Sequence, residues 1–371
     1  MARRAFLAAV GLLLLLAFAC GRGNDRKELT LEGLLAATLS PNDIRELRPQ
    51  PEAWWPSFPE FNVGFDPAPS PIDGDRFWVA QNYQRVGDST NQHVQTTLTL
   101  FEDEQAAEAG LAAIAEANDQ GVTTVEGPAV GDESRYFTRK GAAADADPLA
   151  PPPFETTLRF RVGLVVGRIS MFSDQGYEGS DSLARLFAPV EERIHAFLAG
   201  ELEGEPLPEW MSELMPSSAA AAAATVGPVF GSAVRPPQSW ALIDSTGDPL
   251  AVRDNLKELG TTELGLRRYG LEADPDLVVE VVLFQMANED AAGSWVQDFL
   301  DSVTPELALS AGQTGTLSGF SAYDGSIYEL QFAKGRFAGD VACFAPFGET
   351  SQACEEPVRM LAEQWYAELP E

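Results

Sequence analysis

The sequence has few histidines, few cysteines and few basic residues. Its two histidines, His93 and His195, are too few to hold zinc without cysteine or carboxylate ligands, and neither has neighbours spaced for ligation. The 25 lysines and arginines stand against 56 aspartates and glutamates, which gives a net charge of −31. Such a surface repels phosphate backbones and anionic lipid headgroups. We therefore predict no metal site and no nucleic-acid partner. Because the carboxylates are spread along the chain, they are interpreted as a solvated surface more readily than as a cation site.

The common catalytic and cofactor-binding motifs are also missing. No serine lies in a G-x-S-x-G elbow, and there is no Walker loop or dinucleotide fingerprint. Gly163 and Gly167 fall inside a strand-like run, where glycine indicates a bulge or a closely packed neighbouring backbone. We therefore predict no catalytic residue, no cofactor and no cofactor-binding residue.

The N-terminus has the organisation of an export signal. Arg3 and Arg4 precede an apolar stretch at 5–19, which ends abruptly at Cys20 and a polar segment. Fifteen apolar residues are too few for a membrane-spanning helix, which needs about 20. We predict that residues 1–19 are a signal peptide.

Ala17, Phe18, Ala19 and Cys20 resemble the lipobox of bacterial lipoprotein precursors. Phe18 is bulkier than the usual residue, and the usual leucine is displaced to Leu16. The resemblance implies that Cys20 is lipidated with acyl chains such as palmitate and becomes the mature N-terminus. Residues 20–29 would then be a tether to the bacterial cell membrane or outer membrane. The alternative is a secreted protein cleaved after Ala19 with a free thiol.

Two parts of the chain match each other in order and spacing. Five residues recur 172 positions later: Phe160 and Phe332, Gly163 and Gly335, Gly167 and Gly339, Ile169 and Val341, Phe172 and Phe344. Further matches are Pro189 with Pro357, Val190 with Val358, Phe197 with Trp365, and upstream Thr38 with Thr225, Pro41 with Pro228, Trp54 with Trp240 and Leu100 with Leu283. Because same-order matches are hard to produce by chance, we predict an internal duplication.

The duplication predicts two related domains, at residues 30–200 and 217–371. Between them, the prolines and glycine of residues 201–216 disfavour a continued helix and predict a linker. Alanines at 219–224 then favour a new helix.

Each copy has the pattern of strands, a helix, strands and a final helix. Strands are predicted at 77–86, 96–101, 264–271 and 277–284, and helices at 104–117, 182–198, 289–302 and 356–369. A pair of strands precedes each final helix, and the second strand of the pair carries the glycine motif. The joint between them is a loop at 141–153 in copy one and a tight turn at 324–325 in copy two. This order predicts an α+β fold of two tandem homologous domains, each an antiparallel sheet with helices packed on one face.

Cys343 and Cys354 remain once Cys20 is assigned to lipidation. An exported pair of thiols predicts a disulfide, and two sulfur ligands without a nearby histidine are not a metal site.

Three functions fit these observations. The favoured one is a non-enzymatic binding or sensing lipoprotein of the cell envelope, whose paired domains form a groove for a small-molecule ligand or an envelope protein. The layout loosely resembles small extracytoplasmic domains of actinobacterial lipoproteins and kinase sensor regions, whose roles are binding. The alternatives are an extracytoplasmic hydrolase that uses paired carboxylates and a structural envelope protein.

Overall fold

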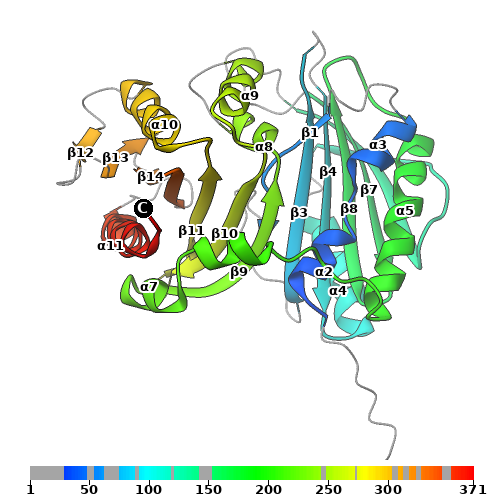
Figure 1. The fold of residues 1–371 in the computed structure, drawn as a ribbon. Coiled ribbons are helices and arrows are strands. Elements are labelled where there is room, and N and C mark those ends of the chain that lie inside the picture. Colours follow the sequence, from blue (N-terminus) through cyan, green and yellow to red (C-terminus); the bar gives the residue numbers. More distant parts are fainter. Residues whose placement is uncertain are drawn as a thin grey trace, which may run out of the picture.

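The computed structural model describes residues 29–47, 54–61, 75–87, 92–117, 121–141, 153–243, 248–271, 274–302, 308–311, 317–322, 327–344 and 352–371. Within these ranges the strands form two antiparallel sheets, one of eight strands and one of seven. The two sheets lie beside each other (Figure 1). The predicted α+β class is confirmed.

The first sheet uses the order β1-β3-β4-β8-β7-β6-β5, with β2 paired to β3 outside this path. Its strands are β1 (Trp54–Pro56), β2 (Glu60–Phe61), β3 (Asp75–Arg85), β4 (Gln92–Phe101), β5 (Val122–Val125), β6 (Glu133–Lys140), β7 (Phe154–Val162) and β8 (Val165–Ser173). Its helices are α2 (Leu31–Ala36), α3 (Pro41–Leu47), α4 (Glu104–Ala117) and α5 (Ser180–Leu198).

The second sheet uses the order β9-β10-β11-β15-β14-β13-β12, written from the edge that corresponds to β1. Its strands are β9 (Val226–Arg235), β10 (Leu264–Leu271), β11 (Asp274–Gln285), β12 (Ala308–Ala311), β13 (Leu317–Ala322), β14 (Ile327–Lys334) and β15 (Phe337–Phe344). Its helices are α6 (Glu209–Leu214), α7 (Ser218–Ala223), α8 (Pro237–Ala241), α9 (Pro249–Glu258), α10 (Glu289–Ser302) and α11 (Gln352–Glu368).

The two sheets have the same strand order. Position by position, β3, β4, β8 and β7 of the first sheet correspond to β10, β11, β15 and β14 of the second, and every neighbouring pair is antiparallel. The final helices also correspond, since α5 and α11 each contain an internal proline, Pro189 and Pro357. The predicted duplication is therefore seen in the four central strands of each sheet and in the final helix.

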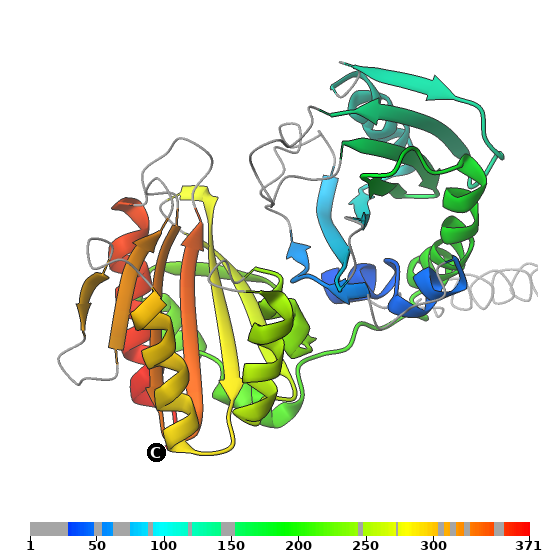
Figure 2. The ribbon, with the colours of Figure 1, turned by 90° about the horizontal axis from the view of Figure 1, so that it is seen from above.

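Helices cover both faces of each sheet. In the first sheet, Val165 and Ile169 pack in the cluster that includes α5, whereas Val166 packs in a separate cluster with α4. Because successive strand residues point to opposite faces, α4 and α5 lie on opposite sides. In the second sheet α10 and α11 are divided in the same way (Figure 2). The helices α4 and α10 therefore depart from the predicted packing on one face, whereas α5 and α11 share their face with other helices.

The glycine-spaced motif forms a hairpin, whereas the sequence predicted a single strand. Phe160 ends up in β7 and Gly167 in β8, with Gly163 in the turn between them. Gly163 has a φ of 57° and its counterpart Gly335 a φ of 53°. Positive φ at the first turn position matches a type II′ hairpin turn, where glycine is favoured. The apolar alternation continues through this turn, so it gave no sign of the reversal.

The upstream matches of the duplication are wrong. Residues 38–47 include the helix α3, whereas the matched residues 225–235 form the strand β9. Trp54 lies in β1 and Trp240 in α8. In the second sheet the strand beside β10 is β9, which precedes Trp240 in the chain. In the first sheet the strand beside β3 is β1, which contains Trp54. The two repeats therefore share a common core but differ at the edge where they meet.

Other predicted elements agree closely with the structure. The helices at 104–117 and 289–302 and the strand at 264–271 have the predicted bounds. The turn at 324–325 lies outside the described residues, but the flanking β13 and β14 pair as predicted. Residues 201–208 form no helix or strand, and α6 follows them with Met211 against Gly265 of the second sheet. The domain limits themselves remain predictions.

One apolar cluster crosses from the first sheet to the second. It includes Leu31 of α2 and Phe61 of β2 together with Ala233 of β9 and Trp240 of α8. At Gly231 of β9 an added Cβ would stand within 3 Å of the Phe61 ring, so the missing side chain lets the two repeats pack closely. Burial of this apolar surface holds the repeats together.

Candidate functional site

A pocket of about 570 Å³ lies where the two repeats and the segment between them meet. We call it the junction pocket. Its lining comes from the start of α2, the end of α5, the 201–208 connector, α6, β9 and β10. The lining residues are Leu29, Thr30, Glu32, Phe197, Gly200, Leu202, Glu203, Gly204, Pro206, Leu207, Ser212, Ser232 and Arg267. The volume falls within the range of small-molecule sites, roughly 300–1,000 Å³.

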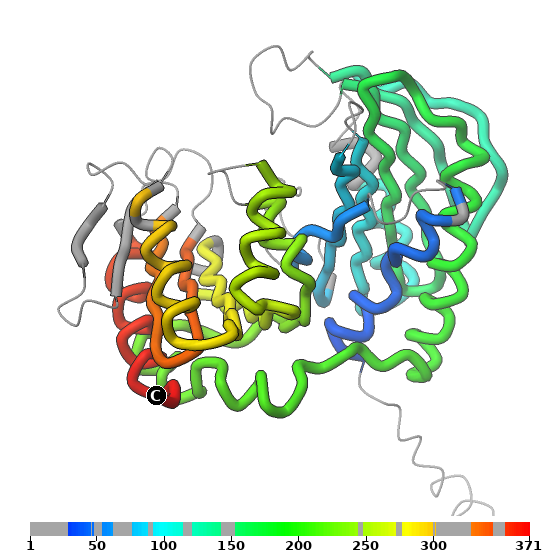
Figure 3. The backbone as a smooth tube through the Cα atoms, turned by 45° about the horizontal axis from the view of Figure 1, so that its top comes forward, coloured from blue at the N-terminus to red at the C-terminus, as the bar shows by residue number. Residues whose placement is uncertain are grey.

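The connector reaches the pocket because of the way α5 ends. Gly200 has a φ of 71°, its N–H donates to the carbonyl of Phe197, and the N–H of Glu201 donates to the carbonyl of Ala196. These two bonds define a Schellman motif, which turns the chain out of the helix. The connector then runs past α2 toward α7 (Figure 3).

Gly204 permits the closest approach between connector and α2. A Cβ at this position would collide with the backbone and side chain of Glu32. At the start of the same helix, the Oγ1 of Thr30 caps α2 by accepting from the N–H of Gly33 at 3.1 Å. The first turn of α2 is thereby fixed against the connector, and both form one wall.

Arg267 supplies the cationic group of the opposite wall. Its guanidinium donates to the hydroxyls of Ser232 at 3.3 Å and Ser212 at 3.4 Å, and to the carbonyl of Pro216 at 3.4 Å. Burial raises the pKa of the neighbouring Tyr269, and Arg267 partly offsets that rise. Arg267 thus connects β9, β10 and α6 around one polar corner, while Phe197 and Leu202 provide an apolar side.

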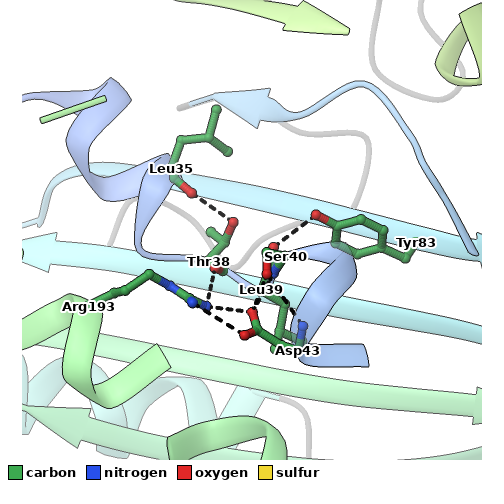
Figure 4. Close-up of polar contacts among 7 residues, drawn as sticks. All are labelled: Leu35, Thr38, Leu39, Ser40, Asp43, Tyr83 and Arg193. Carbon is green, nitrogen blue, oxygen red and sulfur yellow. Dashed lines mark hydrogen bonds and ion pairs between the residues drawn. The ribbon is translucent and has the colours of Figure 1, made fainter. Parts of the chain in front are cut away.

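A polar network fixes α3 and the segment between α2 and α3 (Figure 4). Arg193 of α5 donates to the carboxylate of Asp43 at 2.7 Å and to the carbonyl of Thr38 at 2.8 Å. Tyr83 of β3 donates to the carbonyl of Leu39 at 2.9 Å, and burial raises its pKa to about 12. The segment that follows α2 is therefore tied to both α5 and β3.

Polar contacts also join the repeats directly. Arg235 of β9 donates to the amide oxygen of Gln81 in β3 at 2.7 Å. Arg253 of α9 lies 5.2 Å from the ring centre of Trp55, and Phe58 lies 6.2 Å from Trp240. Burial lowers the pKa of Arg235. These contacts fix the relative position of the two halves of the pocket.

Cys20, the predicted lipidation site, lies outside the described residues. Cys343 of β15 and Cys354 of α11 form a disulfide with their Cα atoms 5.6 Å apart, as predicted. The matching positions in the first repeat, Met171 and Leu186, are both buried in one apolar cluster.

The two histidines do not converge. His93 points from β4 to the α4 side of the first sheet, and burial lowers its pKa to about 4. His195 is exposed in the last turn of α5, on the other side of the sheet. Among the described residues, no group of three or more histidine, cysteine, aspartate or glutamate side chains is arranged to hold a metal ion.

Paired carboxylates occur in the second repeat, but in its interior. Asp340 is 2% exposed, and burial followed by the charge and hydrogen bond of Glu329 raises its pKa well above the usual value. Next to them, Glu280 accepts from Arg268 at 2.6 Å. None of these four side chains lines the junction pocket. The pair therefore does not form the open cleft that the hydrolase hypothesis requires.

No protein-family model matches the chain, and no curated protein matches its sequence. Among solved structures the chain is similar to the extracellular domain of PknH from Mycobacterium tuberculosis, with 13% identity, a TM-score of 0.34, and coverage of 46% of this chain and 98% of that domain. A TM-score of this size does not establish a shared fold, and the likeness assigns no function. In the part of the chain that is described, no helix has the length and apolar composition to cross a bilayer.

Sequence reasoning predicted a groove between the repeats but named none of its residues. The connector glycines and prolines were interpreted only as breaks in helix formation. Arg267 carried no signal, because an arginine within a strand run is ordinary until the strand order places it beside the connector.

Proposed function

We propose that this protein is a lipid-anchored extracytoplasmic binding protein whose junction pocket holds a small ligand. The observation that supports it is the pocket itself, which both repeats and the connector build together. The lining combines an apolar side at Phe197 and Leu202 with hydrogen-bonding groups at Arg267 and Ser212. The ligand that fits this chemistry is a small molecule with an apolar body and a polar end.

The position of the pocket supports an action close to the membrane. Leu29 and Thr30 line the pocket, and Cys20 precedes Leu29 by nine residues. Nine residues reach at most about 30 Å when fully extended. A lipid on Cys20 would therefore keep the pocket within that distance of the bilayer surface.

The pocket is tested with anilinonaphthalene sulfonate, a fluorescent probe that has an apolar body and an anionic end. The protein is the chain from residue 20 onward with Cys20→Ser. We expect Ser212→Trp, which fills the pocket, to weaken probe binding at least tenfold, and Arg267→Gln to weaken it severalfold. Ser218→Trp, at an exposed position on α7 outside the lining, is the matched control. Equal binding by all four proteins would remove the pocket as the ligand site.

The anchor is tested separately by Cys20→Ala in cells that make the full chain. Acyl chains supply the membrane affinity, so we expect the variant to leave the membrane fraction. Mass spectrometry of the N-terminal peptide should show the lipid in the parent protein. Unchanged membrane retention together with an unmodified Cys20 would contradict lipidation.

A further inference from the structure

The α4 side of the first sheet concentrates positive charge in a chain that is otherwise strongly acidic. On this side the adjacent strands β6, β7 and β8 carry five arginines and two glutamates, and we call this surface the arginine face. Its charged residues are Arg135, Arg139, Arg159, Arg161, Arg168, Glu133 and Glu155. One fifth of the 25 basic residues of the chain thus lie on one face of three strands.

Three of these arginines stand in a row across the sheet. Arg135 pairs with Arg159, and Arg159 pairs with Arg168. Like charges directly opposite each other destabilise a sheet. Arg159 is only 5% exposed, so its charge is also largely removed from water. Arg135 already pairs with Glu133 at 3.0 Å. A negative group placed in contact with the row would be attracted by more than one guanidinium group at once.

A small pocket of about 60 Å³ opens at this row. It is lined by Val122, Phe137, Arg139, Glu155, Thr157, Arg159 and Arg168. A single water needs about 10–15 Å³ measured in this way, so the pocket holds roughly four waters or one tetrahedral oxyanion. It is too small to enclose a nucleotide.

The side chains around the pocket are held in position. Glu155 accepts from Arg139 at 2.7 Å and from the hydroxyl of Thr157 at 2.7 Å. Arg159 lies 4.8 Å from the ring centre of Phe137, and Arg168 donates to the amide oxygen of Gln95 at 2.8 Å. These contacts orient two guanidinium groups toward one space, which suits the planar, forked recognition of an oxyanion.

The fold itself does not require arginine at these positions. In the second repeat, β14 and β15 have the register of β7 and β8, and Gln331 and Asp340 occupy the places of Arg159 and Arg168. Glu329 likewise occupies the place of Thr157. The same architecture thus forms with carboxylates and an amide on this face. The arginine row is a property of the first repeat alone, which indicates a role in binding.

We propose that the arginine face binds a phosphate or sulfate group, held by Arg159 and Arg168 in the pocket beside Thr157. The group is either free in solution or carried by a lipid headgroup, since the recognition chemistry is the same. This site is separate from the junction pocket and does not depend on it.

The test uses the chain from residue 20 onward with Cys20→Ser, titrated with sodium phosphate and, separately, with sodium chloride at equal ionic strength. We expect phosphate to raise the unfolding temperature more than chloride does, and calorimetry to show saturable binding. Arg168→Gln should weaken this binding at least tenfold. Arg185→Gln, which alters an exposed arginine of α5 on the opposite side of the sheet, should leave it unchanged.

Glu155→Gln gives a test with the opposite sign. It keeps the shape of the side chain and removes a negative charge beside the site, so phosphate affinity should rise severalfold. This readout stands even if Arg168→Gln does not fold. Vesicles of phosphatidylglycerol form the second arm: sedimentation that depends on Arg168, without a response to free phosphate, would assign the group to a lipid. No response in either arm, or equal losses for Arg168→Gln and Arg185→Gln, would overturn the proposal.

Discussion

Phe160 and Gly167 face each other across the hairpin of β7 and β8, and the phenyl ring fills the space where a side chain on Gly167 would stand. Phe332 and Gly339 repeat this arrangement in β14 and β15. An aromatic ring that covers a cross-strand glycine restores the packing that the glycine lacks. The spacing that both repeats share therefore reflects a packing unit. In each repeat the first glycine of the motif makes the hairpin turn, and the second lies under the phenylalanine ring.

Gly167→Ala should destabilise the protein by about 1–3 kcal/mol, because its Cβ would overlap the Phe160 ring in a filled core. Gly293→Ala is the control, since nothing lies within 4 Å of a Cβ at that position in α10. There alanine should stabilise the helix by up to about 1 kcal/mol. Urea unfolding measures both. Two variants that shift stability in the same direction would contradict the packing unit.

Arg193→Met should lower the free energy of unfolding by about 1–3 kcal/mol, because it removes charge-assisted hydrogen bonds to Asp43 and Thr38. The carboxylate of Asp43 is only 11% exposed and would lose its cation. Arg185→Met changes an exposed residue of the same helix and should have a small effect. Probe binding at the junction pocket should weaken in Arg193→Met, because the start of α2 lines the pocket and Arg193 fixes the segment after this helix. Equal stability of the two variants would argue against this role.

The disulfide of Cys343 and Cys354 closes a short loop between β15 and α11. Its loss through Cys343→Ser with Cys354→Ser should cost about 3 kcal/mol in the chain-entropy account of cross-links. Non-reducing peptide mapping of the protein isolated from the cell envelope gives the direct check on the bond. Finding both thiols free in that material would disprove it.

His93 should make the protein less stable in mild acid. Its folded pKa is about 4 against 6.5 for the unfolded chain, because burial disfavours the charged imidazole. Between these values the unfolded state binds the extra proton, so stability falls as pH drops from 6.5 to 4, by at most about 3 kcal/mol. His93→Gln should flatten this dependence in urea unfolding at pH 4.5 and 7. An unchanged slope would show that other groups cause it.

Asp340 should make the protein less stable as pH rises, the opposite of the effect of His93. Its folded pKa lies well above 3.8, through burial and then through Glu329 and Glu280, while Arg268 pairs with Glu280. Its contribution is present below pH 3.8 and is lost as pH rises toward the folded pKa. Asp340→Asn should therefore raise the unfolding free energy at pH 7. Asp298→Asn, on the exposed side of α10, should not, and equal responses would refute the assignment.

Local periodicity predicted the helices and several strands of this fold well. Residues 104–117 and 289–302 have one apolar face, and their bounds match α4 and α10. The disulfide followed from counting cysteines. The register between the two repeats was predicted less well. Leu98 pairs with Gly167, and Leu283 pairs with Gly339. The counterpart of Leu283 is therefore Leu98, and the predicted match with Leu100 is wrong. A shift of two residues keeps the same face, so the pattern could not detect it.

The edges and the sites depended on information that a single sequence does not display. Trp54 and Trp240 each follow a matching Arg-Pro segment, yet Trp54 lies in a strand and Trp240 in a helix. Both pack near the line where the repeats meet. The arginine row required the pairing of Arg159 with both Arg135 and Arg168, which only the strand order supplies. The junction pocket likewise required the path of the connector.

The placement of α2 determines where mechanical load from a membrane anchor would enter the fold. This helix follows the N-terminal segment directly and contacts β3, β9 and α5. Force applied through Cys20 would therefore be shared between both repeats at their meeting line instead of peeling a strand from one edge. The bond between Arg193 of α5 and Asp43 of α3 ties the next part of the chain to the first repeat. With a lipid on Cys20, displacement of the membrane would act first on α2, whose start lines the junction pocket.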